Sequence, residues 1–149
     1  MAQGKEAVIQ DIMHQELEVI DRTSTIMATA ERMRAGRIGS LLVRGASATD
    51  DDQGITGIVT ETDLVRKVIA KEVAAEAATV DSIMTIPLLT IAPDRPIVDA
   101  SHLMEMNHVR HLCVSNGERI VGLISVRDLV RHFVNADRKS TRLNSSHSS

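Results

Sequence analysis

The chain has 149 residues, 43% of them hydrophobic and 25% charged, which is typical of a soluble globular protein with one domain or two small ones. A net charge of −3 and a single aromatic residue, Phe133, argue against nucleic-acid binding. No apolar run reaches the roughly 18 residues of a membrane span, and no signal peptide is recognisable. With Cys113 as its single cysteine, the chain has no internal disulfide and suits a reducing cytoplasm.

The sequence repeats itself, so two copies of one fold are expected. Ile12-Met13 returns as Ile83-Met84, and the motif Gly57–Asp63 returns as Gly122–Asp128. After each motif the chain continues with Leu-Val-Arg. Matching residues lie 71 positions apart early in the copies and 65 apart at the motif. A loop insertion in the first copy, Ala46–Gln53, accounts for the difference.

Each copy predicts the element order β-α-β-β-α after a short helical piece at the Ile-Met pair. In the first copy we expect an extended segment at 17–20, a helix at 26–35 and a last helix at 60–78. The second copy predicts an extended segment at 88–91, a helix at 97–107, a hairpin of 112–114 with 120–124, and a last helix at 125–134. Asn116-Gly117 between two apolar runs favours the hairpin.

Residues 137–149 do not follow this pattern, because they are polar, aperiodic and rich in serine. The stretch resembles the translation of a common DNA-sequencing adapter, so we interpret it as a disordered tail that is not native. The native C-terminus beyond Ala136 is left open. The predicted domains are therefore 8–78 and 79–136, followed by the tail.

The repeated motif places a hydroxyl at a strand end and a carboxylate three residues later. In one interpretation Thr60 and Ser125 cap their helices, and Asp63 and Asp128 complete capping boxes. Capping boxes normally use Glu or Gln, so Asp in both copies favours a carboxylate that points outward. Such a carboxylate can bind ribose hydroxyls while the hydroxyl and the helix N-terminus bind a phosphate. The preceding glycine lets backbone or ligand approach closely.

Two β-α-β-β-α copies that end in Gly-x-x-Ser/Thr-x-x-Asp resemble a tandem pair of CBS (cystathionine-β-synthase type) domains, a Bateman module. The resemblance covers about 8–134. It implies an α/β (α+β) fold of two CBS repeats packed as a pseudo-two-fold pair. It also implies a regulatory adenosine-containing ligand such as AMP, ADP, ATP or S-adenosylmethionine, sometimes NAD, and no catalytic cofactor.

The resemblance also implies roles for residues of this chain. The ribose would be bound by Asp63 and Asp128, and the phosphate by Thr60, Ser125, Arg110 and His111. The first copy has Gly39 and Ser40 in place of Arg110 and His111, which suggests unequal sites. The adenine pockets would be formed by Val19, Ile20 and Asp21 in one copy and Thr90, Ile91 and Ala92 in the other.

The function implied is that of a stand-alone, non-catalytic sensor that signals nucleotide occupancy to a protein partner. The family also implies a homodimer, for which the helices offer Met27, Met33, Met104 and Met106, although the more ordinary use of each of these methionines is packing in the core of the chain. Two alternatives remain open. In the first, the chain is a ligand-free structural or interaction module in which both Asp residues are simply caps. In the second, it is a regulatory fragment of a longer enzyme or transporter.

No metal site or catalytic centre is predicted. His102, His108 and His111 lack the spacing of a helical histidine pair, and Asp50–Asp52 lacks that of an EF-hand loop. We interpret His102 and His108 as surface residues, His111 as a strand residue, and the three aspartates as a hairpin tip. Cys113 is interpreted as a small buried hydrophobe. No Ser-His-Asp or Cys-His arrangement is recognisable.

Overall fold

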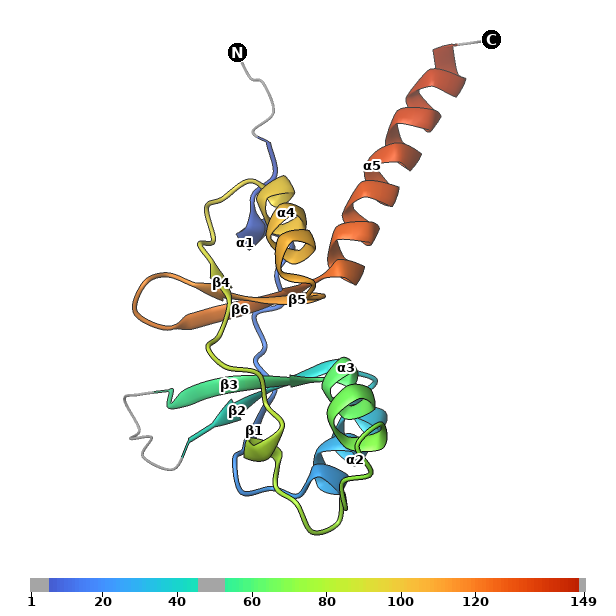
Figure 1. Ribbon diagram of the computed structural model, residues 1–149. Helices are drawn as coiled ribbons and strands as arrows, with labels where there is room; N and C mark the ends of the chain where they lie inside the picture. Colours follow the sequence, from blue (N-terminus) through green and yellow to red (C-terminus); the bar gives the residue numbers. More distant parts are fainter. Residues whose placement is uncertain (1–5, 46–52, 148–149) are drawn as a thin grey trace. The chain divides into compact units, whose positions relative to one another are not determined.

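A computed structural model of the chain describes residues 6–45 and 53–147. The chain forms two compact units, a first unit of Glu16–Leu89 and a second unit of Met1–Gln15 with Thr90–Ser149. Each unit contains a three-stranded sheet and helices, which confirms the predicted α/β class (Figure 1). Most of the insertion in the first copy, including its three aspartates, lies outside the described residues, as do Ser148 and Ser149.

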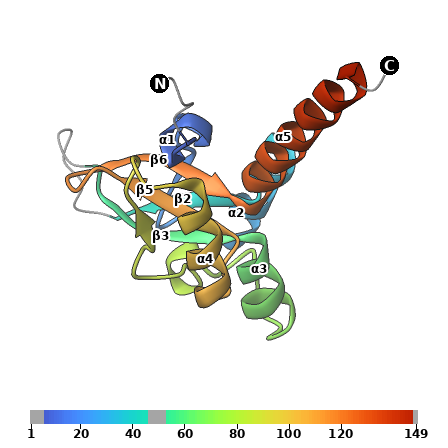
Figure 2. The same ribbon diagram turned by 90° about the horizontal axis from the view of Figure 1, so that it is seen from above.

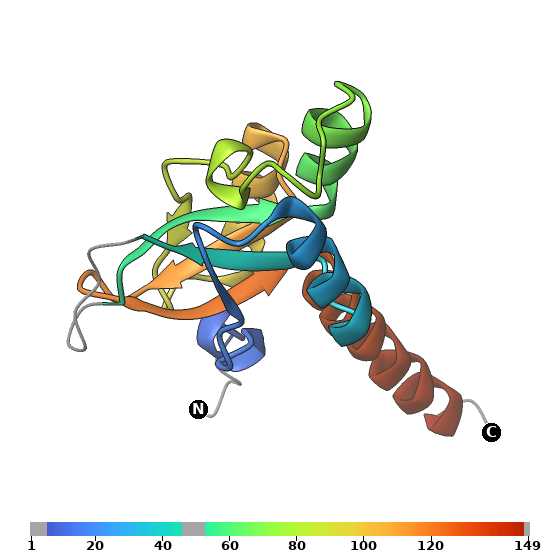
Figure 3. The ribbon, with the colours of Figure 1, turned by 90° about the horizontal axis from the view of Figure 1, so that it is seen from below.

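The first unit contains, in chain order, β1 (Val19–Asp21), α2 (Ile26–Gly36), β2 (Ser40–Arg44), β3 (Ile55–Thr60), α3 (Glu61–Asp63), the π-helical segment η1 (Leu64–Ile69) and the 3₁₀ turn η2 (Val80–Ser82). The strand order is β1-β2-β3, with β1 parallel and β3 antiparallel to β2. Viewed from below, β3 runs directly into α3 (Figure 3). This junction therefore carries the Gly57–Asp63 motif.

The core of the first unit lies between the sheet and its helices. Ile26 and Met33 of α2 pack with Leu41, Val43 and Val59 of the sheet. Alternate residues of a strand face the same side, so Leu41 and Val43 reach this core from one face of β2. This cluster contains no aromatic side chain, so its hydrophobic contribution to folding comes from the burial of aliphatic surface.

The second unit repeats the arrangement with α1 (Ile9–Ile12), β4 (Thr90–Ile91), α4 (Ile97–Asn107), β5 (His111–Ser115), β6 (Ile120–Ser125) and α5 (Val126–His147). Its strand order is β4-β5-β6, again with one parallel and one antiparallel pair. α1 and α4 lie over the same face of this sheet (Figures 1 and 2). The predicted helix 97–107 and the hairpin around Asn116-Gly117 are confirmed.

The segment before the first strand of each copy, which we call its lead-in, pairs with the last strand of the other copy. In the second unit His14 and Leu123 exchange two backbone hydrogen bonds of 2.8 and 2.9 Å. In the first unit Thr85 and Ile58 do the same, at 2.7 and 3.1 Å. The compact units therefore exchange lead-ins, whereas the predicted domain boundaries follow the order of the repeats.

The last helices end elsewhere than predicted. In the first copy the helix ends at Ile69 rather than near residue 78, because Glu72 takes a left-handed φ of 54° and the N–H of Val73 turns back to the carbonyl of Val68. In the second copy α5 continues to His147, and no glycine or proline interrupts it. Residues 137–147 thus form the end of this helix. Their interpretation as read-through stays a prediction.

The four methionines predicted for a dimer face divide into two groups. Met33 and Met104 are only 4% exposed and belong to the cores, which is the alternative that the sequence left open for them, so they are not available for a dimer face. They lie on the sheet-facing side of α2 and α4, in register with the buried Ile26 and Ile97. Met27 and Met106 are 39% and 75% exposed and remain available.

Cys113 is a buried core residue, as predicted, with 1% exposure, and its burial raises the pKa of the thiol to about 11. At pH 8 only about one thiol in a thousand is then ionised. We expect the native protein to react with a disulfide reagent such as dithionitrobenzoate at least a hundredfold more slowly than the urea-unfolded chain, with absorbance as the readout. Equal rates for native and unfolded protein would contradict this burial.

Candidate functional site

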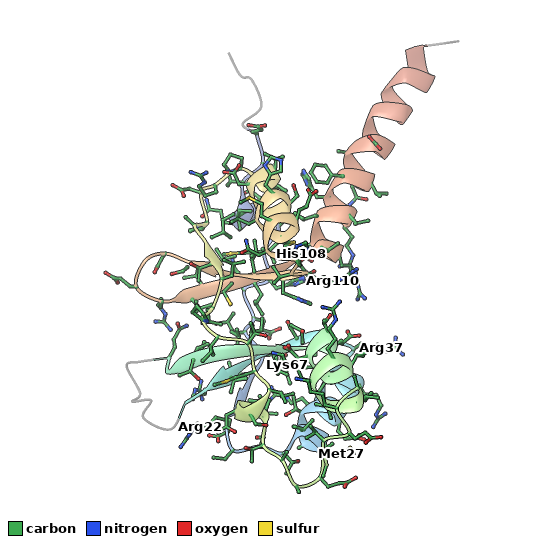
Figure 4. The ribbon with its side chains drawn as sticks, viewed as in Figure 1. Arg22, Met27, Arg37, Lys67, His108 and Arg110 are labelled. Atoms are coloured by element: carbon green, nitrogen blue, oxygen red, sulfur yellow. The ribbon has the colours of Figure 1, made fainter. Side chains whose placement is uncertain are left out.

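The carboxylate of Asp63 is the centre of a hydrogen-bond network at the end of β3. Its Oδ2 accepts from the N–H of Thr60 at 2.9 Å and from the Thr60 hydroxyl at 3.2 Å. Its Oδ1 lies 2.9 Å from the Nζ of Lys67 and accepts from the hydroxyl of Thr85 at 3.2 Å. Lys67 also donates to the carbonyl of Ile83 at 3.0 Å (Figure 4). The network thus joins the motif to the lead-in of the second copy.

Asp128 occupies the matching position in the second unit. Its Oδ2 accepts from the N–H and the hydroxyl of Ser125, at 2.8 and 3.0 Å. Its Oδ1 accepts from the Nε2 of His14 at 2.7 Å. In both units, therefore, one carboxylate oxygen completes the capping box and the other contacts a side chain of the exchanged lead-in.

The sequence favoured carboxylates of Asp63 and Asp128 that point outward, but in the structure they do not. Each residue is only 6% exposed, and each does form a capping box despite its short side chain. The box closes because the hydroxyl of Thr60 or Ser125 also accepts from the N–H of the aspartate, at 3.3 Å in both units. The local contacts of the motif are thus those that the capping interpretation predicts.

Each lead-in lies so close to the first glycine of a motif that a side chain at that glycine would not fit. A Cβ on Gly122 would lie 2.5 Å from the sulfur of Met13 and 2.9 Å from the carbonyl oxygen of His14. A Cβ on Gly57 would lie 2.8 Å from the sulfur of Met84. The close approach predicted for these positions is therefore made by the protein itself, through the methionine of each repeated Ile-Met pair.

Arg110 and His111 lie at the same end of the second sheet as Ser125. His111 is opposite Ser125 in the β5–β6 ladder, and the N–H of Val126 donates to the carbonyl of Arg110 at 2.9 Å. Arg110 is exposed beside the first turn of α5 (Figure 4). The structure thus brings together the polar residues that the sequence proposed for a phosphate in the second copy. In the first copy Ser40 takes the place of His111, opposite Thr60.

The residues proposed for adenine lie on the first strand of each sheet or just after it. Val19, Ile20 and Asp21 form β1, and β2 separates them from the motif at the end of β3. Two strand spacings amount to about 10 Å, roughly the length of a nucleoside. The exposed Asp21 carboxylate accepts two hydrogen bonds from Thr23, which hold its pKa below the usual range. In the second unit Thr90 and Ile91 form β4, and the exposed Ala92 follows.

The sequence analysis did not assign three residues to the site: His14, Lys67 and Thr85. The repeat contains a signal for two of them, because His14 and Thr85 are each the residue after the repeated Ile-Met pair. Lys67 follows Asp63 by four residues, the spacing of a helical ion pair. What the sequence does not reveal is that a lead-in reaches the motif of the other copy.

Metal and membrane features were searched over residues 6–45 and 53–147. No group of three or more His, Cys, Asp or Glu side chains there is arranged to bind a metal ion. His102 and His108 are exposed. None of the helices in that part of the chain is both long and apolar enough to cross a bilayer.

Comparison with known proteins identifies the family. The model of the CBS domain matches residues 9–70 and again 80–135. The mitochondrial CBS domain-containing protein CBSX3 of Arabidopsis thaliana is 31% identical over 80% of this chain, which spans 58% of that relative.

Solved structures agree with this assignment. A protein with CBS domains from Burkholderia ambifaria is 29% identical, with a TM-score of 0.78 over 87% of this chain and 95% of that one. The CBS domain pair of protein MJ0100, solved with 5′-methylthioadenosine and S-adenosylmethionine, is 21% identical, with a TM-score of 0.75 over 89% of this chain and 99% of that one. This chain, with its two matched segments and its duplicated fold, belongs to the CBS-domain family.

Proposed function

We propose that the chain is a non-catalytic regulatory CBS pair that binds an adenosine-containing ligand and signals its occupancy to a protein partner. One observation carries the proposal. In both units a buried carboxylate uses Oδ2 for the capping box, while Oδ1 interacts with side chains, those of Lys67 and Thr85 in the first unit and that of His14 in the second. Side chains can exchange with the hydroxyls of a ribose, whereas backbone donors cannot.

The proposed ligand follows from the chemistry around each carboxylate. A carboxylate oxygen accepts hydrogen bonds from ribose hydroxyls, and an exposed guanidinium such as that of Arg110 pairs with phosphate oxygens. In the second unit Ser125, Arg110 and His111 gather beside Asp128. The first unit offers Lys67 as its cation beside Asp63. The ligand found in the MJ0100 pair supports an adenosine compound, with Val19–Asp21 and Thr90–Ala92 proposed to hold the base.

Signalling in this proposal is a population shift. A ligand that replaces lead-in contacts of Asp63 or Asp128 binds best to the conformation in which the lead-in has moved. A partner that recognises this conformation is then coupled to the ligand, and the coupling is reciprocal. The lead-ins are thus the proposed link between occupancy and output.

The homodimer is likewise a proposal. Val65 and Ile69 on η1 are 57% and 72% exposed, and Val130, Phe133 and Val134 on α5 are 42–54% exposed. Val65 and Ile69 match Val130 and Val134 in the repeat, and the members of each set lie four or fewer residues apart, so each set shares one helix face. Exposed apolar faces of this kind are typical of protein interfaces. We propose that these residues, and the exposed Met27 and Met106, make dimer contacts in their own units.

Ligand binding is tested by thermal unfolding and calorimetry with AMP, ATP and S-adenosylmethionine. We expect at least one of them to raise the unfolding free energy by about 2.7 kcal/mol at a hundredfold excess over its Kd. The double variant Asp63→Asn/Asp128→Asn is expected to bind at least tenfold more weakly, and Glu118→Gln in the exposed hairpin turn to bind normally.

The same experiment decides between the alternatives. If none of the three ligands changes the unfolding temperature, or if the double variant keeps full affinity, the sensor proposal is overturned. The aspartates are then caps only, and the ligand-free interaction module becomes the better description.

A further inference from the structure

The two carboxylate oxygens that the proposed function assigns to the ligand have partners of different origin. In the first unit Oδ1 of Asp63 lies 2.9 Å from the ammonium of Lys67, four residues later on the helical segment that continues the motif. In the second unit Oδ1 of Asp128 lies 2.7 Å from the ring of His14, which belongs to a lead-in. A movement of the lead-ins therefore carries His14 away from its aspartate, whereas Lys67 stays.

Lys67 is also held in place by two further contacts. Its Nζ donates to the carbonyl of Ile83 at 3.0 Å and to the hydroxyl of Thr85 at 3.3 Å. The same hydroxyl donates to Oδ1 of Asp63 at 3.2 Å, so the three polar side chains form a closed set. The imidazole of His14, by contrast, is 59% exposed, against 39% for the lysine. A ligand that reaches Oδ1 of Asp63 must therefore break a connected set of contacts.

The second copy has a different residue at the position of Lys67. The equivalent residue in the repeat is His132, four residues after Asp128. Its ring packs edge-to-face against Phe133, with the centroids 5.2 Å apart. Lysine carries a full positive charge at neutral pH, so a fixed cation four residues after the motif's aspartate is a property of the first copy.

We propose that Lys67 makes the first site the weaker of the two, so that the ligand fills the second site first. The inference rests on the proposed function, since it concerns the same carboxylates. A ribose hydroxyl is a neutral donor, and a hydrogen bond from a charged donor is about twice as strong as one from a neutral donor. A ribose that replaces Lys67 at Asp63 therefore exchanges a stronger bond for a weaker one.

Filling the second site first decides which lead-in responds. Occupancy at Asp128 displaces the lead-in that contains His14, whereas the lead-in that contains Thr85 stays bonded to Asp63 and Lys67. The signal of the singly occupied protein is then the movement of the first copy's lead-in alone. Lys67 is thus a residue that determines both the order of filling and the side of the output.

The probe must isolate the carboxylates from the phosphate contacts. Arg110 and His111 gather near Ser125, and both favour a phosphate at the second site for a reason unrelated to Lys67. Lys67 itself can pair with a phosphate only after it has left Asp63, so its charge both helps and hinders a phosphorylated ligand. Adenosine offers the ribose hydroxyls without a phosphate and is therefore the probe.

The experiment is calorimetry with adenosine at one pH and one salt concentration on single-site variants. Asp63→Asn leaves the second site, and Asp128→Asn leaves the first. We expect adenosine to bind Asp128→Asn about fivefold more weakly than Asp63→Asn, the size of a partly exposed ion pair. Lys67→Met, added to Asp128→Asn, should recover this factor. Arg66→Met, which removes the exposed neighbouring cation, should change binding less than twofold in the same background.

The reciprocal variant places a lysine in the second copy. His132→Lys, added to Asp63→Asn, puts an ammonium four residues after Asp128, and adenosine binding should weaken about fivefold. Thermal unfolding checks that each variant is folded. A purely structural role of Lys67 is distinguished by the sign of its effect, because loss of a structural contact lowers affinity, whereas we expect Lys67→Met to raise it.

Equal affinities of the two single-site variants, or tighter binding at the first site, would overturn this inference alone. So would a folded Lys67→Met variant that does not gain affinity for adenosine, or a folded His132→Lys variant that loses none. Absence of adenosine binding in the unaltered protein and in every variant would overturn the proposed function and this inference with it.

Discussion

Replacement of Gly122 by alanine is expected to lower the unfolding free energy by about 3 kcal/mol, the upper end of the usual cost of overpacking. The new Cβ would lie 2.5 Å from the sulfur of Met13 and 2.9 Å from the carbonyl oxygen of His14. The methionine can rotate away, but the carbonyl is fixed by the backbone pairing of His14 with Leu123. The lead-in must then shift, which weakens that pairing. Urea unfolding followed by circular dichroism measures the loss.

Gly57→Ala is the matched variant in the first unit and should cost less, about 1–2 kcal/mol. There the nearest atoms to the new Cβ are side-chain atoms of Met84 and Ile86, at 2.8–3.0 Å, and these can adjust. Gly36→Ala, at the end of α2, meets only ordinary contacts beyond 3.5 Å and should be neutral or slightly stabilising. Equal losses at Gly122 and Gly57 would show that the carbonyl of His14 is not the deciding contact, and a loss at Gly36 as large as either would show that contact with a lead-in is not the cause.

Much of the fold could be predicted because the sequence contains two copies of it. The helix 97–107 and the hairpin around Asn116-Gly117 follow from local periodicity and turn chemistry, and the repeat transfers the same elements to the first copy. The end of the helix after Asp63 was missed, because the left-handed turn at Glu72 has no glycine to mark it. Ala-rich sequence beyond it looked helical, but tertiary contacts overrode its propensity.

The candidate site was predicted in part, for a related reason. Both aspartates and both hydroxyls lie together as the motif implied, since their contacts are local. Lys67, Thr85 and His14 were missed because two of them reach the site from the exchanged lead-in, far away in the sequence. The prediction that both carboxylates point outward was wrong, because these long-range partners bury them. Periodicity gives no information on which copy a lead-in joins.

Replacement of Asp63 by alanine is expected to have the second largest effect, a loss of about 2–3 kcal/mol in the unfolding free energy. The capping box accounts for about 1 kcal/mol of this. The rest comes from Lys67, whose ammonium loses its carboxylate while it still faces the carbonyl of Ile83 and the hydroxyl of Thr85. Lys67 is 39% exposed and can turn partly to solvent, so the cost stays below that of a fully buried ion pair.

Asp128→Ala is the internal comparison, and we expect it to cost only about 1–2 kcal/mol at pH 7. Its partner His14 is 59% exposed and regains water contacts when the carboxylate is lost. A double-mutant cycle of Asp63→Ala with Lys67→Met should give a coupling energy of about 1 kcal/mol. A coupling near zero, or a larger loss at Asp128 than at Asp63, would mean that the lysine does not hold the second copy's lead-in to the first motif. A coupling of the expected size, together with the smaller loss at Asp128, would establish that the two lead-ins are held with different strength, the His14 side being the easier one for a ligand to release.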